Sequence, residues 1–559
     1  MKSKEVSMKN YTKYRQFPAI PLKNRQWPDK LITKAPQWVS SDLRDGNQSL
    51  EVPMSLEQKL QFFQFLVEMG FKTIEISFPA ASDTEFELTR YLIEHGLIPD
   101  DVAIQVLTQS RDHIIERTFE ALKGAKNAVV HLYNSTSTLQ RDVVFHFSKQ
   151  QCIDLAVYGA KKIKEYIDQD TSDTNWILEY SPESFSGTEM DFAVEICDAV
   201  LDVWQPTEEK KAIINLPNTV EMSTPNSYAD QVEYYCTHTR WRPQTIVSLH
   251  PHNDRGTATA ATELGLLAGG ERVEGCLFGN GERTGNADIL NIAMNLYSQG
   301  IDPHLDFSDI DKVVALYEAC TAMEVPPRHP YAGKLVYTSF SGSHQDAIKK
   351  GMAKMASHPD RWEIPYLPID PKDVGRSYEP VIRINSQSGK GGVSFILEHN
   401  FGLVLPKPVQ QEFSRLCTKV SDENHKELMP QEIFDLFDEE YVNVAEPICL
   451  RAYSEKAVDK DTVHVEVAVT VNGAEQVVAG EGNGLLDGFV NGMKQLGVQA
   501  EIVLYSQHAM TSGTEALAVS YVQIQNNGKT AIGAGISSNV SKSALRAVIS
   551  AMNRMENQH

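Results

Sequence analysis

The stretch Thr245-Ile246-Val247-Ser248-Leu249-His250-Pro251-His252 decides the predicted fold, because it reads as a strand that ends in two histidines. Alternate side chains of an extended chain point to the same face. The imidazoles of His250 and His252 are therefore expected to project together, close enough to bind one divalent metal ion. Two polar strand-end residues that bond to loops explain this pattern alone equally well.

Strand-like runs of this kind alternate with amphipathic helices along the first half of the chain. In the first intervening helix, Leu56, Leu60 and Phe63 share one face, and Ser55 with Gln58 forms a capping box. Eight strand–helix units over roughly 250 residues are typical of a (β/α)₈ barrel, which favours a TIM barrel over a doubly wound sheet. The predicted strands are Gln37–Asp45, Lys72–Pro79, Val102–Ser110, Ala128–Ser135, Trp176–Ser184, Ala212–Glu221, Thr245–His252 and Arg272–Gly279.

The pattern of the chain changes on either side of this α/β barrel. A TIM-barrel catalytic domain is predicted over residues 36–305, after an N-terminal arm of residues 1–35. Residues 306–440 look mostly helical, apart from a strand-like Val381–Asn385, and are predicted to form linker subdomains. Residues 441–559 twice show strands that lead through a glycine-rich turn into a helix. This repeat predicts a C-terminal α+β domain of two βββα units.

Composition and charge limit the partners that the chain can have. The 559 residues carry a formal net charge of -22, which argues against nucleic acid or an anionic membrane as a partner. The 7 scattered cysteines indicate reduced thiols, and therefore a cytoplasmic location. No apolar run reaches the length of a membrane span, and no secretory signal is recognised.

Polar and ionisable residues gather at the predicted ends of the strands, where barrel enzymes have their active sites. Asp45 ends the first strand and Asn286 follows the eighth. Because the first, eighth and seventh strands are neighbours in a closed barrel, these two residues are expected to meet His250 and His252. Such a set of nitrogen and oxygen ligands suits Zn²⁺, Mn²⁺, Co²⁺ or Mg²⁺.

Other rim residues allow both a functional and a structural interpretation. Arg44 and Asp45 point to opposite faces of a regular strand, so a catalytic Arg44 needs a twist or bulge, and a salt bridge is the alternative. Glu183, on the same face as Ser181, is either a base or a solvated carboxylate. Thr219 either contacts a substrate carboxylate or caps the next helix.

Taken together, the motifs resemble the 2-isopropylmalate synthase family, in its long form with a regulatory domain. The resemblance runs from about residue 15 to the end of the chain. The broader superfamily, which includes homocitrate, citramalate and hydroxymethylglutaryl enzymes, shares only the motifs around Asp45 and His250. The matching stretches are Asp42–Gln48, Ser181–Glu183, Asn215–Glu221, His250–Asp254, Gly279–Asn286, Ser341–Asp346 and Asn385–Gly392.

The resemblance implies a metal-dependent acyltransferase of leucine biosynthesis. Acetyl-CoA would condense with 3-methyl-2-oxobutanoate to give (2S)-2-isopropylmalate and CoA, with Mg²⁺, Mn²⁺ or Zn²⁺ as cofactor. It also implies feedback inhibition by L-leucine and a homodimer in which the partner subunit contributes His344. The family's metal falls on Asp45, His250 and His252, with Asn286 near or coordinating. Its catalytic roles fall on Arg44, Glu183, His344, Glu282 and Tyr378, its oxo-acid contacts on Ser181 and Thr219, and its leucine site near Gly482, Gly484 and Gly535.

Three alternatives stay open at this point. A sister acyltransferase, homocitrate or citramalate synthase, would share the barrel motifs and differ in its pocket. A metal-dependent barrel hydrolase would carry its histidine pair on the first strand, whereas here the pair lies on the seventh. A catalytically silent amino-acid sensor would use only the C-terminal domain.

Overall fold

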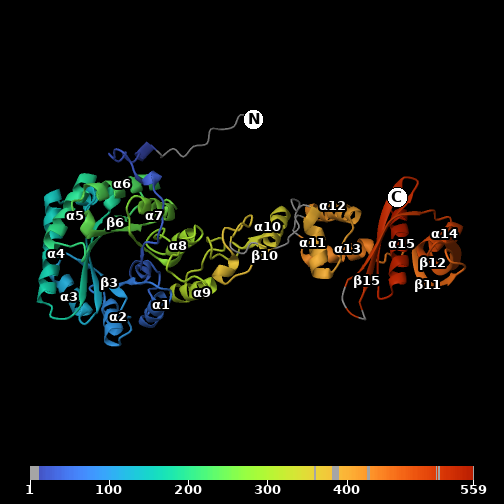
Figure 1. The fold of residues 1–559 in the computed structure, drawn as a ribbon, viewed down its shortest axis with the longest axis horizontal. Coiled ribbons are helices and arrows are strands. Elements are labelled where there is room, and N and C mark those ends of the chain that lie inside the picture. The colour runs from blue at the N-terminus through green and yellow to red at the C-terminus, as the bar shows by residue number, and fades with distance from the viewer. Residues whose placement is uncertain are drawn as a thin grey trace. The chain divides into compact units, whose positions relative to one another are not determined.

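The computed structural model describes residues 12–357, 361–380, 390–424, 428–510, 513 and 516–557. The chain divides into two compact units (Figure 1). The first unit comprises residues 1–337 and 369–377, and the second comprises residues 338–368 and 378–559. The domain boundaries proposed from the sequence, at residues 35, 305 and 440, stay a prediction.

The first unit is built on a closed barrel of parallel strands, as predicted. Within the described residues eight strands follow one another in chain order around the barrel, and β1 pairs with β8 to close it. The strands are β1 (Gln37–Ser40), β2 (Thr73–Ser77), β3 (Ala103–Gln109), β4 (Asn127–Ser135), β5 (Asn175–Glu183), β6 (Ala212–Asn218), β7 (Thr245–Pro251) and β8 (Arg272–Gly275).

The first strand is shorter than predicted, and the difference matters for the site. β1 ends at Ser40, and Asp42–Gly46 forms a wide, π-type helical turn in place of the expected strand end. The amide groups of Arg44 and Gly46 both donate to the carbonyl oxygen of Ser41, at 3.2 and 3.0 Å. This turn supplies the departure from regular strand geometry that a functional Arg44 requires.

Helices surround the barrel in the order that the sequence suggests. The first helix begins at a capping box in which Ser55 and Gln58 bond to each other's backbone, as predicted. Its buried face includes Phe62, Phe63 and Leu66. The helices are α1 (Leu56–Glu68), α2 (Asp83–Glu94), α3 (Asp112–Leu122), α4 (Lys149–Gln169), α5 (Met190–Trp204), α6 (Pro225–His238), α7 (Ala258–Leu267), α8 (Ile289–Tyr297) and α9 (Ile310–Thr321).

The second unit combines helices with two small antiparallel sheets. Its first part holds β9 (Thr338–Ser339), α10 (Gly342–Met355), β10 (Glu379–Pro380), α11 (Lys390–Phe401), α12 (Lys407–Asn424) and α13 (Pro430–Tyr441). The predicted strand Val381–Asn385 lies outside the described residues. The two predicted βββα units are confirmed: β11 (Ile448–Ala457), β12 (Val463–Val471), β13 (Ala474–Gly482) and α14 (Leu485–Met493), then β14 (Glu501–Ala509), β15 (Ala518–Asn526), β16 (Lys529–Ser537) and α15 (Val540–Glu556).

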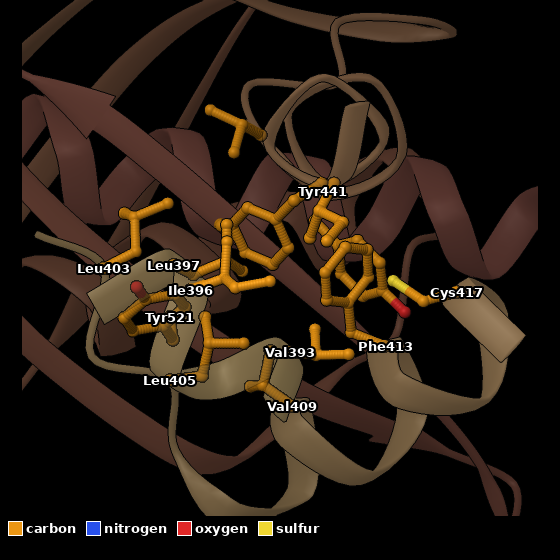
Figure 2. Packing of buried hydrophobic residues seen from close by; sticks show 14 of the residues in the cluster. Val393, Ile396, Leu397, Leu403, Leu405, Val409, Phe413, Cys417, Tyr441 and Tyr521 are labelled. Carbon is orange, nitrogen blue, oxygen red and sulfur yellow. The ribbon is translucent and has the colours of Figure 1, made fainter. Parts of the chain in front are cut away.

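Strand β15 separates two apolar cores of this unit, because its side chains alternate between the two faces of the sheet. Val519 and Tyr521 pack with apolar residues of the helices α11–α13. Figure 2 shows Tyr521 in this cluster. Val522 and Ile524 face a second core that joins both βββα units through α14 and α15. The sheet of the second βββα unit is therefore covered by helices on both faces.

Glycines let the helices of the βββα units approach their sheets very closely. A Cβ atom added to Gly482 would lie 2.4 Å from the backbone nitrogen of Gly488 in α14. At Gly535 it would lie 2.0 Å from the carbonyl oxygen of Ser543 in α15. Such contacts are far closer than van der Waals distance, so both glycines are required by packing.

Candidate metal centre at the barrel mouth

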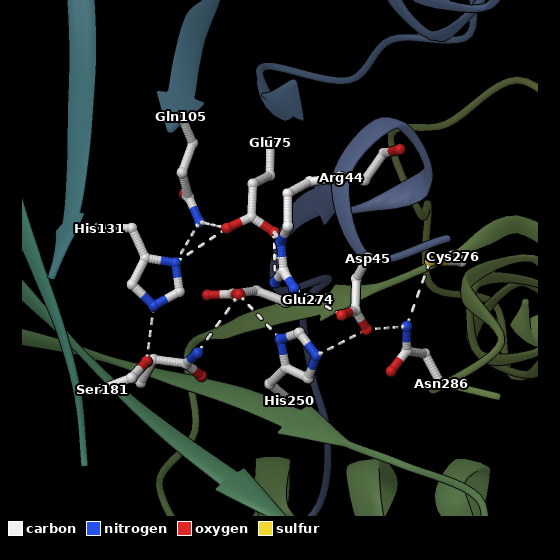
Figure 3. Close-up of polar contacts among 12 residues, drawn as sticks. Arg44, Asp45, Glu75, Gln105, His131, Ser181, His250, Glu274, Cys276 and Asn286 are labelled. Carbon is white, nitrogen blue, oxygen red and sulfur yellow. Dashed lines mark hydrogen bonds and ion pairs between the residues drawn. The ribbon is translucent and has the colours of Figure 1, made fainter. Parts of the chain in front are cut away.

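Two elements of the barrel bring the predicted metal ligands together. Asp45 lies on the wide turn after β1, His250 lies on β7, and His252 follows it. The Nε2 atoms of His250 and His252 lie 3.7 and 4.0 Å from Asp45 Oδ2 (Figure 3 labels Asp45 and His250). All three side chains are buried, and their ligand atoms lie within 4.8 Å of one another. Residues that are distant in the sequence therefore lie close together, as expected from the predicted strand order.

Asn286 completes this group from the loop between β8 and α8. Its backbone forms an isolated bridge with His252, and its Nδ2 donates to Asp45 Oδ2 at 2.7 Å. Its Oδ1 is buried and has no hydrogen-bond partner in the described part of the chain, and the same holds for His252 Nδ1. Rotating the Asn286 amide by half a turn would present the oxygen to the same point. These donors fit a divalent cation of borderline hardness.

Arg44 lies on the same side as Asp45 because of the wide turn. Its Nη1 lies 2.5 Å from Asp45 Oδ1, and its Nε donates to Glu75 Oε2 at 2.7 Å. Burial alone would raise the pKa of Asp45, but the charge of Arg44 and a hydrogen bond from His250 hold that pKa well below its usual range. Asp45 is therefore an anionic candidate ligand.

A carboxylate behind His250 fixes the orientation of its ring. His250 Nδ1 lies 3.1 Å from Glu274 Oε2, so Nε2 is the nitrogen that faces Asp45. Burial opposes the charged form of His250, but hydrogen bonds to Asp45 and Glu274 raise its pKa to about 9. Burial and the charge of His250 lower the pKa of His252 to about 4. Glu274 in turn accepts from Ser248 Oγ at 2.8 Å.

A second buried polar group was not found by sequence reasoning. His131 on β4 binds Glu75 Oε1 through Nδ1 at 2.9 Å and Ser181 Oγ through Nε2 at 2.7 Å (Figure 3). Glu75, His131 and Glu274 also have metal-ligand spacing. Both nitrogens of His131 are already hydrogen-bonded, so we interpret this group as a hydrogen-bond network beside the candidate metal ligands. The sequence feature that could have indicated it is a polar residue on the inward-facing side of an otherwise apolar strand.

The remaining barrel residues of the predicted site line one cavity. Its volume is about 310 Å³, and its walls include Arg44, Ser181, Glu183, Thr219 and Glu282 together with the three metal-ligand candidates. Ser135 Oγ donates to Glu183 Oε2 at 2.5 Å, and Thr219 Oγ1 accepts from the Ser184 backbone N–H at 2.9 Å. Thr219 thus keeps its hydroxyl proton available for a ligand.

Other predicted site residues belong to the second unit. His344 is exposed in the first turn of α10, where its ring stacks on Tyr366 with a centroid distance of 3.9 Å. Tyr378 immediately precedes β10. Gly482 ends β13, Gly484 precedes α14 and Gly535 lies within β16. Their catalytic and regulatory roles stay predictions.

Three family profiles match successive parts of the chain. Residues 35–316 match a profile described as HMGL-like, residues 334–398 match "Alpha-isopropylmalate synthase, post-catalytic domain-like", and residues 427–556 match "LeuA allosteric (dimerisation) domain".

In the described residues, no helix combines the length and apolar character needed to cross a membrane.

Curated relatives named 2-isopropylmalate synthase align with the chain over nearly its full length. The protein from Acetoanaerobium sticklandii is 61% identical, and the alignment covers 98% of this chain and 97% of that protein. The protein from Clostridium acetobutylicum is 53% identical, with 97% and 99% covered. The protein from Pseudomonas putida GB-1 is 52% identical, with 98% and 97% covered. The chain therefore belongs to the 2-isopropylmalate synthase family.

Proposed function

We propose that this chain condenses acetyl-CoA with 3-methyl-2-oxobutanoate to give (2S)-2-isopropylmalate and CoA. The observation that supports this most directly is the meeting of Asp45, His250 and His252 beside a cavity that Arg44 also lines. Relatives of this name, among them one that is 61% identical, support the same reaction. A cavity of about 310 Å³ suits a small 2-oxo acid beside a metal ion.

In this proposal Asp45, His250 and His252 hold Mg²⁺, Mn²⁺ or Zn²⁺, and Asn286 is the fourth candidate ligand. The bound ion would supply Lewis-acid polarisation of the keto group. Glu274 holds the ring of His250. A carboxylate that accepts a hydrogen bond from a metal-binding histidine raises the affinity for the metal, because it fixes the orientation of the ring.

The other residues of the cavity would orient the oxo acid and move protons. Arg44 is placed to stabilise negative charge on the keto oxygen, since its guanidinium already lies beside Asp45. Thr219 can donate its hydroxyl proton to the substrate carboxylate, and Ser181 contributes a hydroxyl held by His131. Glu183 and Glu282, with His344 and Tyr378, are the proposed acid–base groups.

Release of thiol from acetyl-CoA tests the function directly. A panel of 2-oxo acids is assayed with and without each divalent cation. The expected result is metal-dependent CoA release that is fastest with 3-methyl-2-oxobutanoate. Faster release with 2-oxoglutarate or with pyruvate would assign the chain to homocitrate or citramalate synthesis instead, and no release with any oxo acid would exclude the proposed reaction.

We also propose that L-leucine inhibits the enzyme by binding near Gly484. A Cβ atom added at Gly484 meets no atom within 4 Å, so a side chain can be introduced there without a clash at its Cβ atom. Gly484→Leu should relieve inhibition and keep the basal rate, whereas the control Ala474→Leu at the other end of β13 should change neither. Retained inhibition in Gly484→Leu would remove this assignment. Removal of the βββα units is a poorer test, because α11–α13 pack against β15 and β16 and would lose part of their apolar core.

A homodimer with shared active sites is the last part of the proposal. Subunits that carry His344→Ala are mixed with subunits that carry Glu183→Ala. Partial recovery of activity is expected if each site draws His344 from the partner subunit. Absence of recovery in mixed dimers would place His344 in its own subunit's site or outside the chemistry.

A further inference from the structure

A buried arginine at the start of β8 connects opposite sides of the barrel interior. Arg272 is 1% exposed, and its Nη2 donates to Gln105 Oε1 on β3. The strands β1 and β2 separate β8 from β3 around the barrel, so this bond crosses the interior. Inward-facing positions of TIM barrels are usually occupied by branched apolar side chains. A buried guanidinium in such a position points to a role beyond filling space.

One branch of its contacts leads to the candidate metal ligand His250. Arg272 Nη1 donates to Glu274 Oε1, and Glu274 Oε2 lies 3.1 Å from His250 Nδ1. The same Nη1 donates to Ser248 Oγ at 3.0 Å, and Ser248 Oγ donates to Glu274 Oε1 at 2.8 Å. Arg272 and Ser248 therefore hold one oxygen of the carboxylate while the other oxygen orients the ring of His250.

The other branch leads to Arg44. An arginine offers only donors, so the contact with Arg272 requires the oxygen end of the Gln105 amide. The nitrogen end then faces Glu75, with Nε2 at 3.3 Å from Glu75 Oε1 (Figure 3). Glu75 Oε2 accepts from Arg44 Nε at 2.7 Å. Arg272 thus sets which end of the Gln105 amide meets the carboxylate that holds Arg44.

The shape of the guanidinium matters for this arrangement as well as its charge. Two different nitrogens of Arg272, held in one plane, reach Glu274 and Gln105. Glu179 is a further partner, since its Oε2 lies 3.2 Å from Nη1. The ammonium group of a lysine would carry the same charge to these carboxylates, but it places all its donors on a single nitrogen. Only an arginine can therefore serve both branches with a fixed geometry.

We propose that Arg272 is a positioning residue of the metal centre. Through Glu274 it fixes the ring of His250, and through Gln105 and Glu75 it fixes the guanidinium of Arg44. This rests on the proposed function, because it takes His250 as a metal ligand and Arg44 as the group that stabilises the oxyanion. The alternative is an ion pair that only neutralises Glu179 and Glu274 and stabilises the barrel.

Arg272→Lys separates these two interpretations because it keeps the charge and removes the planar fork. Calorimetric titration should show an affinity for Mn²⁺ that is lower by about tenfold, and kcat at saturating Mn²⁺ should also fall about tenfold. A lower unfolding midpoint with wild-type Mn²⁺ affinity and kcat would overturn the proposal. The matched control is Arg242→Lys, since Arg242 pairs with Glu271 outside the metal-site cavity and should leave both quantities unchanged.

A double-mutant cycle tests whether the effect on the metal passes through Glu274. If it does, Arg272→Lys should lower the Mn²⁺ affinity of the Glu274→Gln variant no further, whereas additive losses would contradict this path. Gln105→Met cuts only the branch to Arg44, and it decides that branch even if Arg272→Lys does not fold. It should lower kcat several-fold and leave the Mn²⁺ affinity unchanged, and a wild-type kcat would overturn this branch.

The titrations also keep this proposal separate from the proposed function, because they need no turnover. If no oxo acid reacts, the proposed reaction is excluded, but a tenfold loss of Mn²⁺ affinity that is not additive with Glu274→Gln still supports the role of Arg272 at His250. Turnover with wild-type Mn²⁺ affinity in Arg272→Lys gives the opposite result. Absence of Mn²⁺ binding by the wild-type protein would overturn both.

Discussion

The interior of the barrel and the core of the βββα domain bury very different side chains. At the barrel centre Glu75, Glu179 and Glu274 are fully buried, and Arg272 is 1% exposed. In the described residues from 441 onward, the buried side chains are apolar or uncharged. Burying charge is unfavourable unless each group is paired. The charged interior of the barrel therefore lowers stability unless its groups pair with one another, and this pairing fixes the positions of the candidate metal ligands. The C-terminal core is organised for close packing instead.

Close packing takes an extreme form in the C-terminal core. Gly535 of β16 and the backbone of α15 approach closer than any side chain would allow. In the barrel, by contrast, long side chains fill the centre and bond to one another. The difference shows that polar substitutions should affect binding in the barrel, and that size should matter most in the βββα units.

Loss of a metal ligand should have the largest effect. His252→Ala removes one of the two imidazoles, so turnover should fall about a thousandfold or more, because Lewis-acid stabilisation contributes several kcal/mol. Metal content after dialysis and the thiol-release rate measure this. The control is His238→Ala, an exposed histidine that stacks on Tyr234 in α6. A folded His252→Ala protein that still binds metal and turns over would remove the metal assignment.

Size alone should matter at Gly535. Gly535→Ala places a methyl group against the Ser543 carbonyl, and overpacking of this kind costs about 1–3 kcal/mol of the free energy of unfolding. Gly484→Ala, in open space, is the matched control and should leave the unfolding midpoint unchanged. Chemical denaturation followed by circular dichroism measures both. Equal midpoints for the two variants would contradict the packing role of Gly535.

Glu274 should affect metal binding while leaving the ligands themselves in place. Glu274→Gln keeps the size of the side chain and removes the charge behind His250, so metal affinity should fall about 10–100-fold. Calorimetric titration with Zn²⁺ or Mn²⁺ gives the affinity. Glu271→Gln is the control, because Glu271 pairs with Arg242 away from the site. Unchanged affinity in Glu274→Gln would show that His250 is oriented without it.

The smallest effect concerns an ion pair outside the metal centre. His329 Nε2 lies 2.6 Å from Asp288 Oδ2; burial opposes the charged ring, but this contact raises the pKa of His329 above its usual value. The stabilisation is therefore complete below the unfolded-state pKa of about 6.5 and is lost as pH rises through the folded-state pKa. Relative to His329→Gln, the wild type should lose about 1 kcal/mol of unfolding free energy between about pH 6 and pH 9. A constant difference across this range would contradict the role of the pair.

Most of the fold could be predicted because period and strand count are local signals. Alternation and amphipathic helices gave all eight barrel strands, and the glycine-rich turns gave the two βββα units. The end of β1 could not be predicted, because alternation of apolar and polar residues does not show that the amides of Arg44 and Gly46 bond to Ser41 instead of a neighbouring strand.

The site was predicted only in part, for a related reason. His250 and His252 stand at the end of a strand and Asp45 on the turn after another, where barrel geometry makes polar residues informative. His131, Glu179 and Glu274 lie within strands, and their partners come from other strands. A sequence shows that such residues alternate with apolar ones, but pairing them requires the register of neighbouring strands.

The wide turn at Asp42–Gly46 also sets the directions in which its consecutive side chains point. Consecutive residues of a strand point in opposite directions, whereas they are separated by about 100° in an α-helix and by less in a wider helical turn. This arc places the side chains of Arg44 and Asp45, adjacent in sequence, beside one another at the mouth of the barrel. Deleting a single residue from it would swing the carboxylate away from the imidazoles and leave the sheet bonds of β1 intact. Such a deletion would leave a barrel of normal shape whose candidate metal ligands no longer meet.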